Sequence, residues 1–168
     1  MPGTVYALLV GINDYQGALK SLKGCVEDVT QLAAILEARL APGQFKPNFL
    51  LDRDATRDNV IAAFAAHLGQ AKDGDVALFA YSGHGSRERV QPEFRYLEPD
   101  GWNQTLVLAD SRLPDSTDLA DKELRALLNR VAGGADDPHV VVILDCCYSG
   151  GGTREPMVGE VSLRQAPA

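Results

Sequence analysis

The sequence lacks the features that mark several classes of protein. It has no basic run, and its 16 Lys and Arg are outnumbered by 23 Asp and Glu, for a net charge of -7. Because nucleic acids and anionic membranes attract the opposite charge, neither is an expected partner. The longest apolar runs, such as residues 140–144, fall far short of the roughly 18 residues of a membrane-spanning helix, and the N-terminus lacks a secretory signal pattern. We therefore expect a cytoplasmic protein.

Cysteine is also scarce. The three cysteines are Cys25, Cys146 and Cys147, and the last two are neighbours. An odd number with two adjacent members is a poor basis for a disulfide framework. No Cys-x-x-Cys or His-x-x-x-His spacing gathers ligands, so the sequence predicts no metal site. A thiol kept reduced for chemistry fits this pattern better.

Two kinds of apolar segment alternate along the chain. Continuous apolar runs typical of buried strands occur at residues 5–10, 49–51, 76–80 and 140–144. Apolar residues at spacings of three and four, typical of amphipathic helices, occur between them at residues 26–40, 56–68 and 119–131. This alternation predicts an α/β fold, in which about four main strands form a mostly parallel sheet flanked by helices.

The remaining segments define the domain organisation. Residues 86–118 are polar and rich in turn residues, so we expect them to cross the surface, with one small strand at residues 105–108. A chain of 168 residues fits a single domain, which we assign to residues 1–150. Residues 151–168 have few periodic apolar positions and are predicted to form a flexible linker.

Two unusual loops follow strands of the predicted sheet. They are YSGHGS at residues 81–86 and DCCYSGGG at residues 145–152, and chemistry in such sheets gathers beyond the carboxyl ends of the strands. An imidazole can favour the thiolate of a nearby cysteine and later protonate a leaving amine, so His84 and a cysteine form a candidate pair. Gly83 and Gly85 free the backbone around His84, which lets the Gly85 N–H point at an oxyanion.

Each of these residues also has a structural explanation. A single loop histidine is usually solvated, and a cysteine at the end of a strand is usually a small hydrophobic residue. The pairing of two glycine-flanked loops at one sheet edge favours a Cys–His site. Strand alternation does not choose between Cys146 and Cys147, because adjacent side chains point to opposite faces and the end of the strand is not fixed.

Five motifs in order resemble the large (p20) catalytic subunit of the caspase-like cysteine peptidases, family C14. They are ALLVGINDY from residue 7, LKGCVEDV from residue 22, ATRDNV from residue 55, GDVALFAYSGHGS from residue 74 and VVILDCCYSG from residue 141. The chain is most similar to the metacaspase and bacterial orthocaspase branch. The resemblance implies a three-layer caspase-like fold and a thiol protease with endopeptidase activity.

The resemblance also implies a role for each matching residue. His84 becomes the general acid and base, Cys147 the nucleophile, and Gly85 and Cys147 the donors of the oxyanion hole. The pocket for the residue before the cleaved bond, P1, maps onto Asp28, Ser82 and Asp145. Two carboxylates in a small pocket favour a guanidinium or ammonium group. We therefore expect cleavage after Arg or Lys.

Other implications concern cofactors and partners. Positions at which calcium-dependent metacaspases tend to place acidic ligands hold Asn103, Asp121, Lys122 and Arg154. A single carboxylate is a poor calcium cage, so we expect no cofactor and no calcium requirement. The resemblance implies a separate p10 small subunit as a partner. Self-cleavage is expected at Arg164 rather than at Arg154, which lies too close to Cys147 to fold back.

Two alternatives remain open. A catalytically silent caspase-like module could act as a scaffold for partners, although both His84 and Cys147 are intact. A flavodoxin-like ligand-binding domain would explain the sheet but leaves both loops without a purpose. By analogy with the family, a peptidase of this kind would act in bacterial stress response, cell death or defence.

Overall fold

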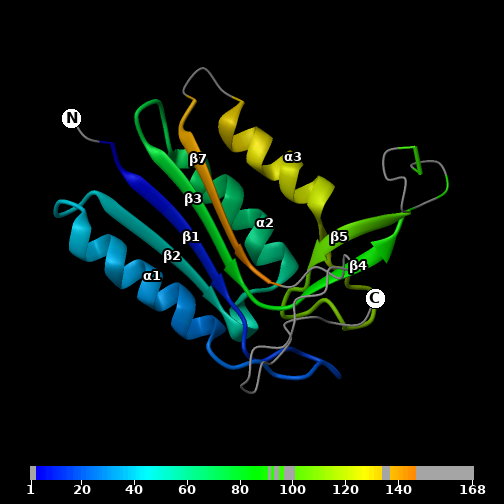
Figure 1. Cartoon of the computed structure of the whole chain (residues 1–168). Coiled ribbons are helices and arrows are strands. Elements are labelled where there is room, and N and C mark those ends of the chain that lie inside the picture. The colour runs from blue at the N-terminus through cyan, green and yellow to red at the C-terminus, as the bar shows by residue number, and fades with distance from the viewer. Residues whose placement is uncertain (1–2, 91, 93–94, 97–100, 134–136, 147–168) are drawn as a thin grey trace, which may run out of the picture.

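The computed structural model describes residues 3–90, 92, 95–96, 101–133 and 137–146. Its main feature is a sheet of four parallel strands in the order β2-β1-β3-β7 (Figure 1). These strands are β1 (Val5–Gly11), β2 (Phe45–Leu51), β3 (Val76–Ser82) and β7 (His139–Asp145). The predicted α/β architecture with four main parallel strands is confirmed. Within the described ranges, no helix is long and apolar enough to cross a membrane.

Helices cover the sheet on both faces because each presents an apolar stripe. They are α1 (Cys25–Arg39), α2 (Arg57–Ala66) and α3 (Asp121–Ala132), and two single 3-10 turns lie at Asp52–Asp54 and Leu68–Gln70. Val29 and Ala33 of α1 pack on one face of the sheet. Side chains of α2 and α3, among them Phe64 and Leu124, pack on the other. The result is three layers with β1 at the centre.

The second strand is longer than the sequence predicts. It begins at Phe45 rather than at residue 49, and it includes the exposed Lys46 and Pro47. Polar residues hid this half of the strand, but β2 lies at the edge of the sheet, where one row of backbone groups faces away from the ladder. A proline is tolerated at such an edge because its missing N–H costs no ladder hydrogen bond.

A second, smaller sheet includes parts of the loop expected at residues 86–118. Its antiparallel strands are β4 (Gly85–Arg89), β5 (Trp102–Leu106) and β6 (Leu119–Ala120). The expected small strand at residues 105–108 therefore lies about three residues too late. Cross-strand contacts hold these polar strands together: the guanidinium groups of Arg87 and Arg89 lie 4.4 and 4.8 Å from the centre of the Trp102 ring.

The register of the parallel sheet aligns the residues at which the strands end. Gly11 pairs with Leu51 and Ser82, and Ser82 pairs with Asp145. At Gly11 the first turn of α1 comes close to the strand, since a Cβ there would lie 2.8 Å from the Cys25 carbonyl oxygen. Glycine thus lets the start of α1 approach the carboxyl edge of the sheet.

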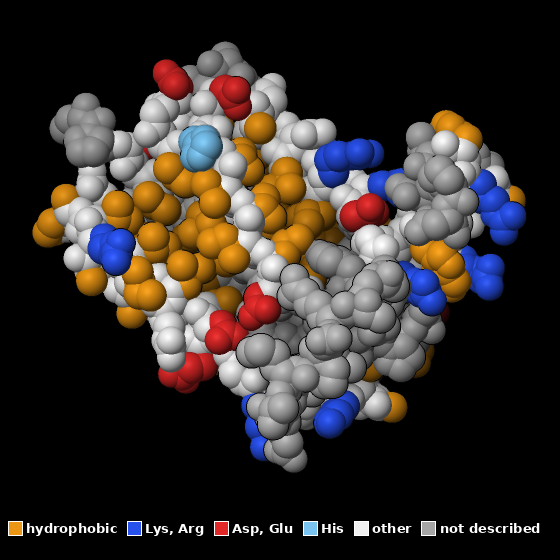
Figure 2. Space-filling view, viewed as in Figure 1, with side chains coloured by type: hydrophobic (Ala, Val, Ile, Leu, Met, Phe, Trp, Pro, Cys, Tyr) orange, Lys and Arg blue, Asp and Glu red, His pale blue; other side chains and the backbone are white. Residues whose placement is uncertain are grey.

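The other edge of the sheet, at β7, carries exposed apolar side chains. Val142 and Ile143 are 38% and 41% exposed, and they point to opposite faces of the sheet. Figure 2 shows hydrophobic side chains gathered on the α1 side of the sheet, over the part that α1 itself does not cover. Among the described residues, no strand pairs with the outer side of β7.

Candidate active site

The loop that carries His84 lies beside the end of β7. The Gly83 N–H donates to the Asp145 carbonyl oxygen at 3.3 Å, and the Ile12 N–H donates to the Ser82 carbonyl oxygen at 3.0 Å. These bonds extend the ladder just beyond the strands. They bring the β3–β4 connection next to the point where the chain runs on toward the two adjacent cysteines.

The His84 side chain is buried and held by one ring nitrogen. It is 3% exposed, and Nε2 lies 2.9 Å from the Lys20 carbonyl oxygen. A carbonyl can only accept, so Nε2 carries the hydrogen and donates it. Nδ1 is also buried, and no described residue forms a hydrogen bond with it. In the neutral form of the ring, the lone pair of Nδ1 is therefore available for a proton donor.

Two tyrosine hydroxyls hold the main chain of His84. The His84 N–H donates to Tyr15 Oη at 2.7 Å. On the other side, Tyr81 Oη lies 2.7 Å from both the His84 and the Val107 carbonyl oxygens, to which its hydroxyl can donate. Burial raises the pKa of both Tyr15 and Tyr81 well above the ordinary value. Both hydroxyls therefore stay neutral at any physiological pH.

The N–H group of Gly85, the predicted oxyanion donor, points away from the neighbouring strand β5. Gly85 pairs with Leu106, and the Val107 N–H donates to the His84 carbonyl oxygen at 3.0 Å. In an antiparallel ladder this makes Gly85 and Leu106 a pair that exchanges no hydrogen bonds. The Gly85 N–H is thus directed away from β5, so it is not used by the ladder.

The three residues of the predicted P1 pocket lie together. Ser82 Oγ is 3.1 Å from Asp28 Oδ2 and 3.4 Å from Asp145 Oδ2. Ser82 is buried, whereas both carboxylates belong to exposed residues. The start of α1 is fixed by Asn13, whose side-chain oxygen accepts the Cys25 N–H at 2.9 Å, and this places Asp28 at the sheet edge. Two negative groups thus converge on one hydroxyl.

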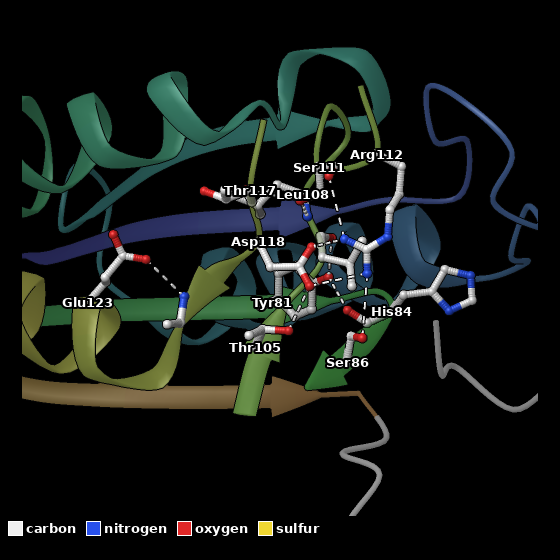
Figure 3. A network of polar contacts seen from close by, with 12 residues as sticks. Tyr81, His84, Ser86, Thr105, Leu108, Ser111, Arg112, Thr117, Asp118 and Glu123 are labelled. Atoms are coloured by element: carbon white, nitrogen blue, oxygen red, sulfur yellow. Dashed lines mark hydrogen bonds and ion pairs between the residues drawn. The ribbon is translucent and has the colours of Figure 1, made fainter. Parts of the chain in front are cut away.

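A buried polar network supports the His84 loop from the side of the small sheet (Figure 3). Arg112 forms an ion pair with Asp118, which also accepts the Thr105 hydroxyl at 2.8 Å. The Arg112 guanidinium lies 3.5 Å from Ser86 Oγ. Asp118 is 7% exposed, so its charge depends on these partners. The network joins β4 and β5 to the loop at residues 108–118.

The positions compared with calcium ligands hold an ammonium group instead of a cage. The Lys122 ammonium contacts the Asn103 side-chain oxygen and lies 3.7 Å from Asp121 Oδ1. In the described ranges, no three His, Cys, Asp or Glu side chains gather in a way that could hold a metal ion. Arg154, the fourth of these positions, lies outside the described residues.

The cysteines differ in their surroundings. Cys25 is buried, and Cys146 packs against the hydrophobic cluster beneath α2 and α3. Cys147 lies outside the described residues, as do the two predicted self-cleavage positions, Arg154 and Arg164. The described site therefore consists of His84, Gly85 and the Asp28–Ser82–Asp145 cluster.

Sequence reasoning did not find all the residues that contact His84. Tyr15 and Tyr81 were noted only as the borders of loops, and Lys20 contributes a carbonyl oxygen that any residue could supply. The sequence signal that could have found them is that each tyrosine lies at or shortly after the end of a strand, within a quoted motif. Aromatic residues there are more often part of the core, and their hydroxyl bonds depend on loop geometry.

Comparison with known proteins identifies the family. A family model described as "Metacaspase, peptidase C14 domain" matches residues 6–154. Metacaspase-7 of Arabidopsis thaliana is 33% identical over 150 residues, covering 86% of this chain and 34% of that protein. Metacaspase-3 of Trypanosoma cruzi is 32% identical over 177 residues, covering 99% of this chain and 46% of that protein.

A solved structure agrees with these relatives. A crystal structure of a protein from Geobacter sulfurreducens superposes with a TM-score of 0.66 at 31% identity, covering 88% of this chain and 52% of that one. The chain thus spans between about a third and a half of the length of these proteins. The match over residues 6–154, with metacaspases as relatives, shows that the chain belongs to the caspase-like C14 peptidases of the metacaspase family.

Proposed function

We propose that the protein is a cysteine endopeptidase that cleaves after Arg or Lys. The thiolate of Cys147 attacks the scissile carbonyl carbon and forms the C–S bond, while the Gly85 and Cys147 N–H groups hold the oxyanion. His84 gives the thiol proton to the leaving amine as the C–N bond breaks. Water then cleaves the thioester, with His84 taking its proton and returning it to the sulfur.

The observation that carries this proposal is the state of the His84 imidazole. Its Nε2–H is bonded to the Lys20 carbonyl oxygen, while Nδ1 is buried without a partner among the described residues. A buried nitrogen of this kind costs free energy unless a donor reaches it. The loop that holds it is bonded to Asp145, two residues before Cys147. A thiol at that position is a donor of the right chemistry.

The choice of nucleophile has further support. Cys146 packs against the hydrophobic cluster, as a small apolar side chain does. We therefore propose Cys147, which lies outside the described residues, as the nucleophile. The assignment of Cys147 otherwise rests on the family resemblance.

The preference for Arg or Lys rests on the carboxylates beside Ser82. Asp28 and Asp145 are exposed and both reach the same hydroxyl. Bringing two negative charges together is unfavourable, and a substrate cation between them relieves the repulsion. A guanidinium group can also donate to both carboxylates at once.

A p10-like segment is the proposed partner at the β7 edge. Val142 and Ile143 expose apolar surface on both faces of an edge strand. Edge strands of this kind favour pairing with another strand, since their outer backbone groups and side chains would otherwise face water. An added strand would pair with the outer backbone groups of β7, and its own side chains would lie beside Val142 and Ile143 on the two faces.

We also propose that activity needs no calcium. The Lys122 ammonium contacts Asn103 and lies close to Asp121, so a positive group already occupies the space between these oxygens. A second cation would be repelled by the ammonium group. The rate of peptide hydrolysis should therefore be the same in a calcium chelator as in millimolar calcium, and a strict calcium requirement would disprove this point.

The central test is hydrolysis of matched reporter peptides by the full-length gene product. The peptides differ only at P1, which is Arg, Lys, Asp or citrulline, the last being a neutral shape match for Arg. We expect much faster turnover with Arg and Lys than with Asp or citrulline. Preference for Asp would overturn the pocket assignment, and absence of all turnover, together with no labelling of Cys147 by a peptide electrophile, would favour the scaffold alternative.

A further inference from the structure

Tyr15 contacts His84 in two ways. Its hydroxyl oxygen accepts the His84 N–H at 2.7 Å. Its ring lies against the imidazole, with the ring centres 4.9 Å apart and the planes tilted by 42°. The same residue therefore fixes the main chain and touches the side chain of the proposed acid and base. A shift of the His84 backbone or a rotation of its ring would alter a contact with Tyr15.

The hydrogen bond to Lys20 does not fix the imidazole by itself. A single hydrogen bond from Nε2 to a carbonyl oxygen restrains one edge of the ring, but it tolerates a range of angles, so the ring can still tilt through small rotations about its side-chain bonds. Such a tilt would move the plane of the ring and the lone pair of Nδ1. The Tyr15 ring lies against the imidazole, so it blocks part of this rotation.

The fit around Tyr15 is tight. A Cβ on Gly83 would lie 2.7 Å from Tyr15 Oη and 2.6 Å from Tyr81 Oη, closer than real Cβ atoms approach. The absence of a side chain at Gly83 is what lets both hydroxyls reach the His84 peptide groups. Tyr15 is itself tied to the scaffold by its neighbour, since the Gln16 N–H donates to the Ala109 carbonyl oxygen at 2.8 Å.

We infer that Tyr15 is a positioning residue for the proton transfers of His84. Removal of the thiol proton and its delivery to the leaving amine both use Nδ1, so both need one orientation of the ring. Tyr15 supplies it through the backbone hydrogen bond and the ring contact. This inference rests on the proposed peptidase function, because only that function requires the two transfers. Misplacement of a reacting group by about 1 Å can cost roughly 100-fold in rate.

The test compares two substitutions of Tyr15 in the full-length gene product. Tyr15→Phe removes the hydroxyl and keeps the ring, whereas Tyr15→Leu removes both contacts. We expect kcat for an Arg-P1 peptide to fall about 10-fold in the first variant and about 100-fold in the second. KM should stay within about twofold, because Tyr15 does not belong to the P1 cluster. The graded loss distinguishes positioning from a general loss of packing.

Tyr6→Phe is the matched control. It also removes one hydroxyl from a tyrosine on or next to β1, but Tyr6 lies at the start of the strand, where its ring meets His67. Its kcat should equal that of the wild type. Active-site titration with a peptide electrophile corrects every kcat for the folded fraction. A corrected kcat for Tyr15→Leu within twofold of the wild type would overturn the inference.

A second readout does not depend on turnover. In protein with ¹⁵N-labelled histidine, the His84 signals should show the Nε2–H form in the wild type and in Tyr6→Phe. In Tyr15→Leu they should show a mixture of the two neutral forms or signals broadened by ring motion. Unchanged His84 signals in Tyr15→Leu would overturn the positioning role. An inactive wild type with altered signals in Tyr15→Leu would instead contradict the proposed function and leave the positioning of His84 supported.

Discussion

His84 and the pair of carboxylates at Asp28 and Asp145 lie at the same edge of the sheet, but they are held in different ways. His84 is 3% exposed, and its N–H, its carbonyl oxygen and its Nε2 each have a partner. Asp28 and Asp145 are exposed, and both approach the hydroxyl of Ser82. His84 is thus held by hydrogen bonds to uncharged groups, whereas the Asp28–Ser82–Asp145 cluster brings two like charges together.

The difference matches the two tasks that we propose. An acid and base must be in place before the substrate arrives, because reorganisation during the reaction raises the barrier. A binding pocket for a cation can instead stay incomplete, since the ligand itself supplies the missing charge. Variants should therefore separate the two: changes near His84 should alter kcat, whereas changes at the carboxylates should alter the choice of P1 residue.

The largest effect is expected from the nucleophile that His84 serves. Cys147→Ala should lower kcat by at least about 1,000-fold, because the covalent route is lost. Cys146→Ala should retain most of the activity, since that side chain packs in the hydrophobic cluster. Rates with an Arg-P1 peptide, taken per mole of protein that circular dichroism shows to be folded, provide the measurement. An inactive Cys146→Ala variant beside an active Cys147→Ala variant would show that the nucleophile is misassigned.

The carboxylates should show the next largest effect. Asp28→Asn and Asp145→Asn should each lower kcat/KM for Arg-P1 peptides by about 10- to 100-fold and leave citrulline-P1 peptides almost unaffected. The rate at which a small neutral electrophile alkylates Cys147 should not change, because the contacts of His84 remain. Asp73→Asn, at an exposed aspartate before β3, is the matched control. Equal losses for the charged and neutral peptides would argue against a charge-reading pocket.

The fold and the carboxyl-edge residues were predictable because they depend on simple periodic patterns. The apolar runs of β1 and β7 predicted two parallel strands, and the parallel register then places Ser82 beside Asp145. The run of β7 does not reveal that this strand lies exposed at the edge of the sheet. The sequence does not predict β4 and predicts β5 about three residues too late, because the residues of these strands are mostly polar or charged. Their stability comes from cross-strand pairs such as Arg89 with Trp102, which a single segment does not reveal.

The partners of His84 were not predictable for a different reason. Tyr15 and Lys20 belong to the loop between β1 and α1. The course of this loop depends on the side-chain oxygens of Asn13 and Asp52, which accept hydrogen bonds from backbone N–H groups. Asp52 even adopts a positive φ of 45° at this place. Propensities and periodicity describe helices and strands, but they contain no information on such long-range polar contacts.

The ion pair between Arg112 and Asp118 supports the His84 loop. Changing it tests this support without altering His84 or the carboxylates at Asp28 and Asp145. Asp118→Asn should lower the free energy of unfolding by about 2 to 3 kcal/mol, because it removes the buried negative charge from the ion pair with Arg112. The double variant Asp118→Asn with Arg112→Met should recover part of this loss. Urea unfolding measures both. Additive losses in the double variant would mean that the two side chains do not depend on each other.

The smallest effect concerns stability at alkaline pH, and it tests the neutral character of the His84 contacts. Burial raises the pKa of both Tyr15 and Tyr81 in the folded protein, whereas a tyrosine in the unfolded chain ionises near pH 10. The folded state therefore binds more protons than the unfolded state above about pH 10. The free energy of unfolding should be insensitive to these groups below that pH and should fall above it. Each tyrosine contributes a slope of at most about 1.4 kcal/mol per pH unit.

Tyr15→Phe should remove one such contribution, so that the stability of this variant falls less steeply between pH 10 and pH 11 than that of the wild type. Parallel curves for the two proteins in urea titrations would show that the Tyr15 hydroxyl is not held neutral by the fold.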